Sequence, residues 1–340
     1  MHRAASKRCR IKSGRASVAE ESEDPREVPW HPRHAAAVIG QAHAQEHFLK
    51  AFRSGKPHHA WLLHGPKGIG KATLAYQLAG KVLGDSAQSR RWIEAKAHPD
   101  LFVLERQLND SKPRKLKSEI SVEDARGLSA FFSHTASGSW RVAIIDAADD
   151  LNSESANAIL KLVEEPPPKS LIFLVSHQPG RLLRTVKSRC LRLGRGPLSE
   201  SDVLNIINAL PLETKPDDEQ LLRAVGQSQG SPGQALTLLT SVGAKAFAQF
   251  AKLTRPRPSD LIAISGQLGG RGVGPDEFMI FTHLLLDWMS QTAKTMNNAR
   301  LAEAHQTVSE NARIAQGFNL DRKQAAMAQL KLVNEALKAS

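Results

Sequence analysis

The 340-residue sequence has few of the residues that build metal clusters, disulfide frameworks and membrane spans. Its two cysteines, Cys9 and Cys190, cannot form a four-thiolate zinc site and do not suggest a disulfide scaffold. No apolar run approaches the roughly 20 residues of a membrane-spanning helix, and the basic N-terminus lacks the apolar segment of a secretory signal. We therefore expect no bound metal, no membrane association and a reducing, cytoplasmic compartment.

The chain is strongly basic, with a formal net charge of +12 at pH 7. Such a bias favours nucleic acid or an acidic partner through long-range attraction. A basic tail explains the charge equally well, because six Lys and Arg residues precede the first acidic residue. Residues 1–28 are basic, then acidic, with few apolar side chains, and this composition predicts a disordered tail.

Residues 29–195 alternate between short apolar runs and amphipathic stretches. The apolar runs indicate buried strands at 60–64, 101–104, 142–146, 171–175 and about 191–193. Helical spacing of apolar residues follows Lys71 and Ser121 and recurs from Ala156 to Val163, and Ser121 to Asp124 fits a capping box. Strands that alternate with helices predict an α/β domain with a parallel five-stranded sheet covered on both faces.

The pattern changes after residue 195, where no strand-like run is evident. Prolines and glycines separate short helical stretches over residues 196–243, which predicts a small helical domain. Residues 244–340 are expected to form a second all-helical domain, interrupted by a turn-rich patch at 266–274.

A glycine-rich loop joins the first predicted strand to the helix that follows it. Residues 65–72 fit the Walker A pattern G-x-x-x-x-G-K-[ST] except at the last position, where Ala72 replaces the hydroxyl residue that ligates Mg²⁺. The hydroxyl of Thr73 comes one residue late, a rotation of roughly 100° on a helix. This loop predicts a phosphate cradle with a poor metal site. The candidate residues are Gly65, Gly68, Gly70, Lys71, Ala72 and Thr73.

Asp146 ends an apolar strand, the position of a Walker B carboxylate. Hydrolysing enzymes usually follow it with a second acid that orients the attacking water, but here Ala147 follows. Asp149 and Asp150 come too late to occupy the same point. Since positioning is most of phosphoryl-transfer catalysis, we expect hydrolysis to be absent or very slow. Capping of the next helix is an alternative role for Asp146.

Five segments occur in the order found in clamp-loader subunits of the AAA+ class, which this chain resembles. They are Val38–Gln41, the incomplete Walker A loop, Asp146–Asp149, Asn157–Pro167 and Ser188–Cys190. The resemblance implies an AAA+ P-loop domain at 29–195, a small helical lid domain at 196–243 and a helical collar domain for oligomerisation at 244–340. It covers residues 31–243 by motif and the C-terminal helices by length and character only.

The resemblance also implies roles for single residues. Val38, Ile39, Gly40 and Gln41 would line the adenine side of a nucleotide pocket, while Ser176 and Gln234 would occupy the two sensor positions. Arg189 would be an arginine finger, offered in trans to ATP on a neighbouring gamma/tau subunit. Cys190 is then expected to pack rather than to act as a nucleophile.

Three departures from the hydrolysing pattern agree with one another: Ala72, Ala147 and Gln234, which replaces the second-sensor arginine. They favour likeness to the delta-prime subunits of bacterial DNA polymerase III, with no independent ATPase activity. The implied partners are gamma/tau and delta subunits, the sliding clamp and primed DNA. Weak ATP or ADP binding is expected, no cofactor is required, and residues 84–98 lack the cysteines that bind zinc in relatives.

Two alternatives remain open at this point. The chain could be an ATP-hydrolysing subunit of the gamma/tau kind, which predicts turnover by the chain alone. It could also be a nucleotide-free DNA-binding module, which predicts steep salt dependence of DNA binding. The basic stretch of Arg181, Arg184 and Lys187 suits a phosphate backbone, but a solvated helix face explains it equally well.

Overall fold

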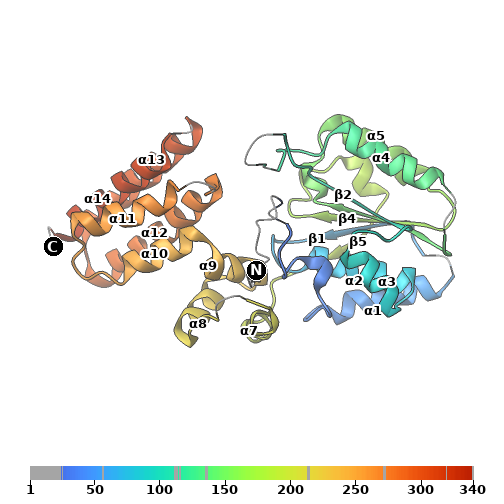
Figure 1. Ribbon diagram of the computed structural model, residues 1–340, viewed down its shortest axis with the longest axis horizontal. Coiled ribbons are helices and arrows are strands. Elements are labelled where there is room, and N and C mark those ends of the chain that lie inside the picture. Colours follow the sequence, from blue (N-terminus) through green and yellow to red (C-terminus); the bar gives the residue numbers. More distant parts are fainter. Residues whose placement is uncertain are drawn as a thin grey trace, which may run out of the picture.

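The computed structural model describes residue 24 and residues 26–55, 57–110, 114, 116–134, 137–212, 215–270, 273–318 and 320–338. Most of the expected tail, including Cys9, therefore lies outside the described residues. The described chain forms three parts in sequence: an α/β part, a group of three short helices and a helical C-terminal part (Figure 1). None of the helices in these ranges combines the length and apolarity needed to cross a bilayer.

The predicted parallel sheet is confirmed. Its strands are β1 (Ala60–His64), β2 (Leu101–Glu105), β3 (Arg141–Asp146), β4 (Ser170–Ser176) and β5 (Leu191–Gly194), in the order β2-β3-β4-β1-β5. All four neighbouring pairs run parallel. Because the strands are parallel, their carboxyl ends share one edge of the sheet, and the phosphate loop follows β1 at that edge.

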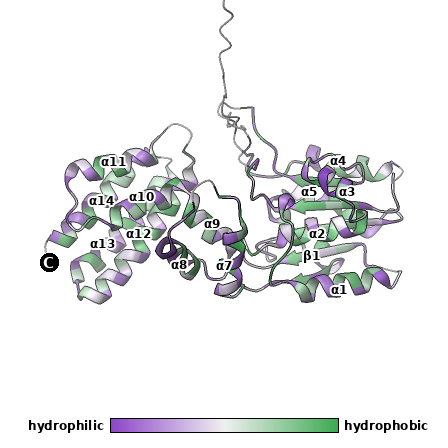
Figure 2. Cartoon of the chain, turned by 60° about the horizontal axis from the view of Figure 1, so that its bottom comes forward, coloured by the Kyte–Doolittle hydropathy of each residue, from purple (hydrophilic) through white to green (hydrophobic). Residues whose placement is uncertain are grey.

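Helices cover the sheet on both faces, as Figure 1 shows. One face packs against α4 (Val122–Ser133), α5 (Ser153–Glu164) and α6 (Arg184–Ser188), and the other against α1 (Ala42–Arg53), α2 (Lys71–Leu83) and α3 (Ala87–Glu94). The central strands are apolar at nearly every position because both of their faces are buried (Figure 2). Alternate residues of β1 divide between the two cores: Leu62 packs with α4 and α5, and Trp61 with Phe48 of α1.

The helices α1 and α3 were not identified individually from the sequence. Helix α1 buries Ala44 and Phe48, four residues apart, and α3 buries only Ser89 and Ile93. So short a buried stripe is a weak signal in a single sequence.

The residues that precede the sheet are tied to its carboxyl edge by ion pairs. Arg26 contacts Glu105 through its Nη1 at 2.8 Å, and Lys96 contacts Glu27 at 3.1 Å. Arg33 of the 3-10 turn Pro32–His34 is buried and also pairs with Glu27. Asp24 and residues 26–28 therefore pack on the α/β part, although the sequence assigned them to the tail.

The second part, which we call the lid, contains α7 (Glu200–Ala209), α8 (Asp218–Gln227) and α9 (Pro232–Thr240) around a small apolar core. The third part, the collar, contains α10 (Val242–Ala251), α11 (Pro258–Leu268), α12 (Pro275–Met296), α13 (Ala299–Gly317) and α14 (Arg322–Lys338) around a larger one. Ser241 alone separates α9 from α10, and its hydroxyl accepts the Ala244 N–H.

Two local expectations were wrong. Helix α11 continues through Gly266 to Leu268, so the turn-rich patch begins later than expected. Ile264 and Leu268 are buried in the collar core, and this packing outweighs the weak helix propensity of one glycine. Asp146 does not cap the following helix, because Asn152 caps α5 by accepting the Ser155 N–H at 2.9 Å. The capping box of α4 is present as predicted.

Candidate functional site

The glycine-rich loop lies between β1 and α2, the strand–loop–helix setting that a phosphate-binding loop requires. Gly70 is the N-cap of α2 and has a φ of 87°, which a side chain would disfavour. The amino end of α2 directs its free N–H groups and positive dipole end toward the loop. Ala72 and Thr73 lie in the first turn of α2.

Lys71 is turned into the loop itself. Its Nζ donates to the carbonyl oxygens of Gly65 at 2.8 Å and Pro66 at 2.5 Å. Burial lowers the pKa of Lys71 to about 8, against the opposing attraction of Asp146 and Asp149. The ammonium that would meet the β- and γ-phosphates is therefore bonded to backbone carbonyls.

Gln41 joins the expected adenine-side segment to the loop. Its side-chain Nε2 donates to the carbonyl oxygen of Ile69 at 2.7 Å, and its backbone carbonyl oxygen accepts from Arg195 Nη2 at 3.3 Å. Val38 and Ile39, just before it, are partly buried. The sequence predicts Gln41 on the adenine side of the pocket, whereas its burial and its bond to the loop emerge only from the fold.

The lid reaches the other side of the loop. Ser231 caps α9 by accepting the Gln234 N–H at 3.2 Å, and its hydroxyl donates to the carbonyl oxygen of Lys67 at 2.9 Å. The Gly233 N–H donates to the Gly68 carbonyl oxygen at 2.9 Å. The side chain of Gln234 is exposed. The amino end of α9 thus touches the phosphate loop through backbone and hydroxyl groups.

Asp146 lies at the carboxyl end of β3, beside Glu105 at the end of β2. Burial raises the pKa of Asp146 to about 6, the nearby Glu105 charge adds to this effect, and Lys71 opposes it. Ala147 is buried where a hydrolysing enzyme carries an acid. The edge therefore offers one carboxylate in the Walker B position.

Asp149 accepts hydrogen bonds from three consecutive residues at the carboxyl end of β4. One of its carboxylate oxygens accepts the Ser176 hydroxyl at 2.7 Å and the Gln178 N–H at 3.3 Å, and the other accepts the His177 N–H. Ser176 is fully buried. Its hydroxyl proton therefore points to a carboxylate of the same chain. Sequence reasoning assigned no role to Asp149; its place three residues beyond the strand end was the available signal.

Arg189 lies at the opposite edge of the sheet. It follows α6 and precedes β5, so it is near the amino ends of the parallel strands, whereas the phosphate loop is at their carboxyl ends. Its Nη2 pairs with Glu164 Oε1 at 3.0 Å, and about 40% of its side chain is exposed. Its Nη1 also donates to the Thr185 carbonyl oxygen at 3.2 Å. Arg189 is thus remote from its own phosphate loop and open to another molecule.

Cys190, next to Arg189, is buried, and burial raises the pKa of its thiol to about 12. A thiol that stays protonated is a poor nucleophile. The structure agrees with a packing role.

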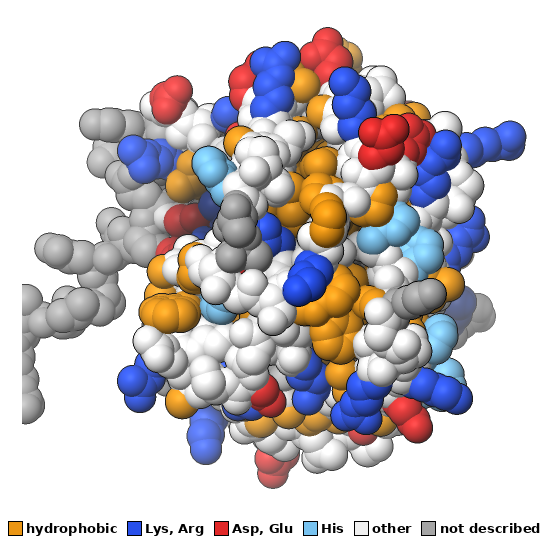
Figure 3. All heavy atoms as spheres, turned by 90° about the vertical axis from the view of Figure 1, so that its right-hand side faces the viewer, with side chains coloured by type: hydrophobic (Ala, Val, Ile, Leu, Met, Phe, Trp, Pro, Cys, Tyr) orange, Lys and Arg blue, Asp and Glu red, His pale blue; other side chains and the backbone are white. Residues whose placement is uncertain are grey.

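Figure 3 views the end of the α/β part that faces away from the collar. Apolar side chains form a streak through its middle, and Lys and Arg side chains are spread around the rim instead of gathering in one patch. This distribution gives no single basic stripe on that face of the kind a DNA-binding module uses.

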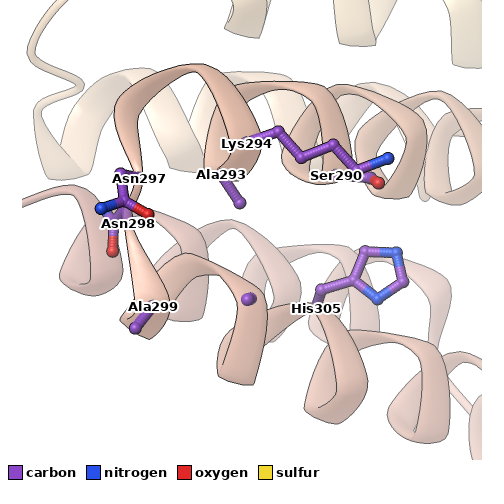
Figure 4. A pocket seen from close by; sticks show the side chains of 8 residues that line it. Ser290, Ala293, Lys294, Asn297, Asn298, Ala299 and His305 are labelled. Atoms are coloured by element: carbon purple, nitrogen blue, oxygen red, sulfur yellow. The ribbon is translucent and has the colours of Figure 1, made fainter.

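Two cavities in the described structure lie away from the phosphate loop. One of about 390 Å³ lies between α12 and α13, where Ser290 and Lys294 face His305 (Figure 4). The other, of about 670 Å³, lies between lid and collar and includes Trp30, Leu238 and Leu284. Within the described ranges no three His, Cys, Asp or Glu side chains are grouped to hold a metal ion.

Comparison with known proteins agrees with this geometry. The family described as "DNA polymerase III, delta subunit" matches residues 40–195, the region of the sheet, the phosphate loop and Arg189. Over this region the chain is similar to DNA polymerase III clamp-loader subunits. DNA polymerase III subunit delta' of Pseudomonas aeruginosa is 36% identical over 185 residues, which are 51% of this chain and 53% of that protein.

Gamma subunits of DNA polymerase III are similar as well. DNA polymerase III subunit gamma of Buchnera aphidicola subsp. Schizaphis graminum is 30% identical over 222 residues, which are 62% of this chain and 58% of that protein. The chain thus matches little more than half the length of these relatives. A solved gamma subunit-related protein from Thermotoga maritima covers 87% of this chain and 98% of its own length, with 14% identity and a TM-score of 0.49.

Proposed function

We propose that this chain is a non-hydrolysing, stator-like subunit of a DNA polymerase III clamp loader that supplies Arg189 to the ATP site of a neighbouring gamma/tau subunit. In this role it assists loading of the sliding clamp onto primed DNA during replication in the bacterial cytoplasm. Its partners are gamma/tau and delta subunits, which it meets through the collar and the α/β part.

The observation that carries the proposal is that the two cationic side chains, Lys71 and Arg189, lie at opposite edges of the sheet. Lys71 and Asp146 are at the carboxyl edge of the sheet without the hydroxyl at 72, the acid at 147 or a second-sensor arginine. Arg189 is at the amino edge and exposed. A five-residue strand is roughly 16 Å long, so Arg189 is far from its own phosphate loop, and this distance supports action on a nucleotide held by another subunit.

The surroundings of Arg189 allow it to exchange its ion-pair partner for a phosphate group. Glu164 holds its guanidinium in position, but an exposed ion pair contributes only about 0–1 kcal/mol. A phosphate group of a partner would therefore displace Glu164 at little cost, and the planar guanidinium would bind its oxygens in a bidentate way.

The test is DNA-stimulated ATP turnover by gamma subunits assembled with this chain. Arg189→Ala is expected to lower turnover by roughly 10³–10⁵-fold at the site it serves, as for other arginine fingers. Arg192→Ala is the matched control, an exposed arginine three residues further on in β5, and should leave turnover unchanged. Normal assembly with unchanged turnover for Arg189→Ala would refute the finger role.

We further propose that the chain's own pocket holds ATP or ADP weakly, without needing a metal ion. The glycines and Lys71 of the loop are present, whereas the Mg²⁺-binding hydroxyl is absent. Calorimetric titration with ADP should give the same weak affinity with and without Mg²⁺. An affinity that rises tenfold with Mg²⁺ would contradict this proposal.

The second candidate is a gamma/tau-like ATPase, favoured by the similarity to gamma subunits. It requires ATP turnover by the purified chain alone. Ala72, Ala147 and the use of Ser176 by Asp149 weigh against it. Turnover that survives purification and disappears in Lys71→Ala would establish this candidate instead.

A further inference from the structure

The larger of the two cavities lies where the lid meets the collar. Its volume is about 670 Å³, and its walls come from α8 and α9 of the lid, α10 and α12 of the collar and the connector before α8. Trp30, from far earlier in the chain, also lines it. Ligand sites in proteins measure roughly 300–1,000 Å³ and occur preferentially at domain interfaces. Both the size and the position of this cavity therefore suit a small molecule.

Contacts within the chain hold the walls of the cavity together. Ser241 alone joins α9 to α10, and Glu277 Oε2 of α12 accepts the Gly243 N–H of α10 at 2.7 Å. A Cβ at Gly243 would lie 2.1 Å from the Glu277 backbone carbonyl oxygen, so only glycine permits this approach of α10 to α12. Since the walls are tied to one another, little ordering would accompany binding of a ligand.

One part of the lining is apolar. Phe247 and Leu284 are buried, and Leu238 and Ile280 are half-buried against the core of the collar. Trp30 adds a half-buried indole. An indole packs favourably against another aromatic ring by offset stacking or by an edge contact. This part of the lining therefore favours a ligand with an aromatic ring.

The charged part of the lining is mostly cationic. Lys215, Arg223 and Lys245 line the cavity and are exposed. Among the described residues of the lining Glu277 is the sole acid, and its carboxylate already accepts a backbone N–H of α10. Arg223 also pairs with Glu219 on the same helix, but water weakens so exposed a pair. The excess of positive charge favours an anionic ligand.

We propose that this cavity is a binding site for a small anionic molecule that carries an aromatic ring. The ring packs against Trp30 and the apolar side chains, and the carboxylate, sulfonate or phosphate group is bound by Lys245, with Lys215 and Arg223 beside it. The cavity is separate from the phosphate loop and from Arg189. The inference therefore goes beyond the proposed function and does not depend on it.

The probe for this site is anilinonaphthalene sulfonate, which combines an aromatic ring system with one anionic group and fluoresces in apolar surroundings. Titrated into the full chain, it should bind with a dissociation constant of roughly 10–100 µM, as expected for a ligand of its size. Phenylnaphthylamine, which has the same ring system without the sulfonate, is the matched probe. It should bind in the same cavity but independently of the cations.

Lys245→Ala tests the anion site. It should weaken binding of the sulfonate probe roughly three- to tenfold, because one charge-assisted contact is lost, and should leave binding of the neutral probe unchanged. Lys252→Ala is the matched control, since Lys252 is an exposed lysine at the end of the same helix that does not line the cavity. Both probes should bind this control as they bind the parent.

Two further variants test the apolar part. Trp30→Leu keeps an apolar side chain but removes the ring, so both probes should bind more weakly. Its control is Trp92→Leu, which replaces a tryptophan of α3 that is 42% exposed. Ala248→Phe places a ring in the cavity from α10 and should prevent binding of both probes. Circular dichroism of each variant checks that the parent fold is retained.

Equal weakening of sulfonate binding by Lys245→Ala and Lys252→Ala would overturn the anion site, because the effect would then be general attraction. Undiminished binding to Trp30→Leu and to Ala248→Phe would assign the probe to another part of the chain. Absence of binding to the parent would show that the cavity takes no such ligand. Either of these results would also overturn the inference. None of the measurements involves Arg189 or a partner subunit, so their failure is distinguishable from failure of the proposed function.

Discussion

The two edges of the α/β sheet treat their cationic groups in opposite ways. At the carboxyl edge, Lys71 is 3% exposed and bonded to two carbonyl oxygens of its own loop. At the amino edge, Arg189 keeps about 40% of its side chain exposed and is held mainly by a surface carboxylate. Burial and backbone bonds make the first group costly to move, whereas the second is held by interactions that water and salt weaken. The difference shows that one cation is enclosed by its own chain, whereas the other is accessible to a second molecule.

The largest expected effect is a loss of ATP turnover when Arg189, at the amino edge, is replaced. Arg189→Lys keeps the positive charge but loses the planar, bidentate guanidinium. If Arg189 binds phosphate oxygens in a partner, turnover in the assembled complex should fall roughly 10³-fold or more, almost as far as for Arg189→Ala. ATP hydrolysis measured with primed DNA checks this. Full activity with lysine would show that a positive charge is sufficient at this position and would contradict bidentate binding by Arg189.

A substitution at the carboxyl edge should instead lower the free energy of unfolding. Asp149→Ala removes the acceptor for the Ser176 hydroxyl and for two backbone N–H groups. Leaving such donors unpaired should lower the free energy of unfolding by about 3 kcal/mol. Asp85→Ala, which breaks an exposed pair with Arg90, should change it by less than about 0.5 kcal/mol. Urea unfolding followed by tryptophan fluorescence measures both, and equal effects would contradict the assigned role of Asp149.

A smaller effect is expected from the carboxylate beside Lys71. Since burial raises the pKa of Asp146 from its ordinary value of 3.8 to about 6, the native state binds this proton more tightly than the unfolded chain does. Its contribution to stability is fully present below pH 3.8 and is lost as the pH rises through about 6. At pH 7.5 Asp146→Asn should therefore raise the free energy of unfolding by about 1–2 kcal/mol, less than the full shift allows because the residue is only partly buried.

Unfolding measured at pH 5, 6 and 7.5 checks this prediction. The stabilisation by Asp146→Asn should shrink toward pH 5, where the parent carboxyl is already protonated. A gain that is independent of pH would assign the effect to packing and not to charge.

The smallest effect concerns the partner of Arg189. Glu164→Gln removes an exposed ion pair and should lower the free energy of unfolding by less than about 0.5 kcal/mol. Turnover in the assembled complex should stay within about twofold, because the arginine itself is retained. A large loss of turnover would mean that Glu164 is required to orient Arg189. The guanidinium would then be fixed by its own chain, as Lys71 is.

Much of the fold could be predicted because it depends on local patterns. Runs such as Leu171–Val175 are apolar at every position, which indicates a strand buried on both faces, and the glycine-rich loop marks the first strand–helix junction. The alternation of such runs with helices gave the parallel sheet. Helices α1 and α3 were missed because each buries only a pair of residues. The end of α11 was misplaced because the burial of Ile264 and Leu268 keeps the chain helical through Gly266.

For the candidate site, too, some properties could be predicted from the sequence and others could not. Lys71, Ala72 and Asp146 could be chosen from the spacing of the sequence motifs, whereas Arg189 could be chosen only through the resemblance to clamp-loader subunits. Their states could not, since no pattern shows that Lys71 bonds to its own loop or that Asp149 takes the Ser176 hydroxyl. These contacts join residues up to 164 positions apart, as Ser231 and Lys67 are.

By itself the sequence determined the sheet, the chemical groups that the phosphate loop retains and lacks, and the presence of an arginine before the last strand. Those properties follow from the order and type of neighbouring residues. Only the tertiary structure decided which edge each cation occupies, how deeply each is buried and which distant groups hold the loop. Burial, pKa and hydrogen-bond partners depend on the packing of segments remote in sequence, and this packing separates the enclosed Lys71 from the open Arg189.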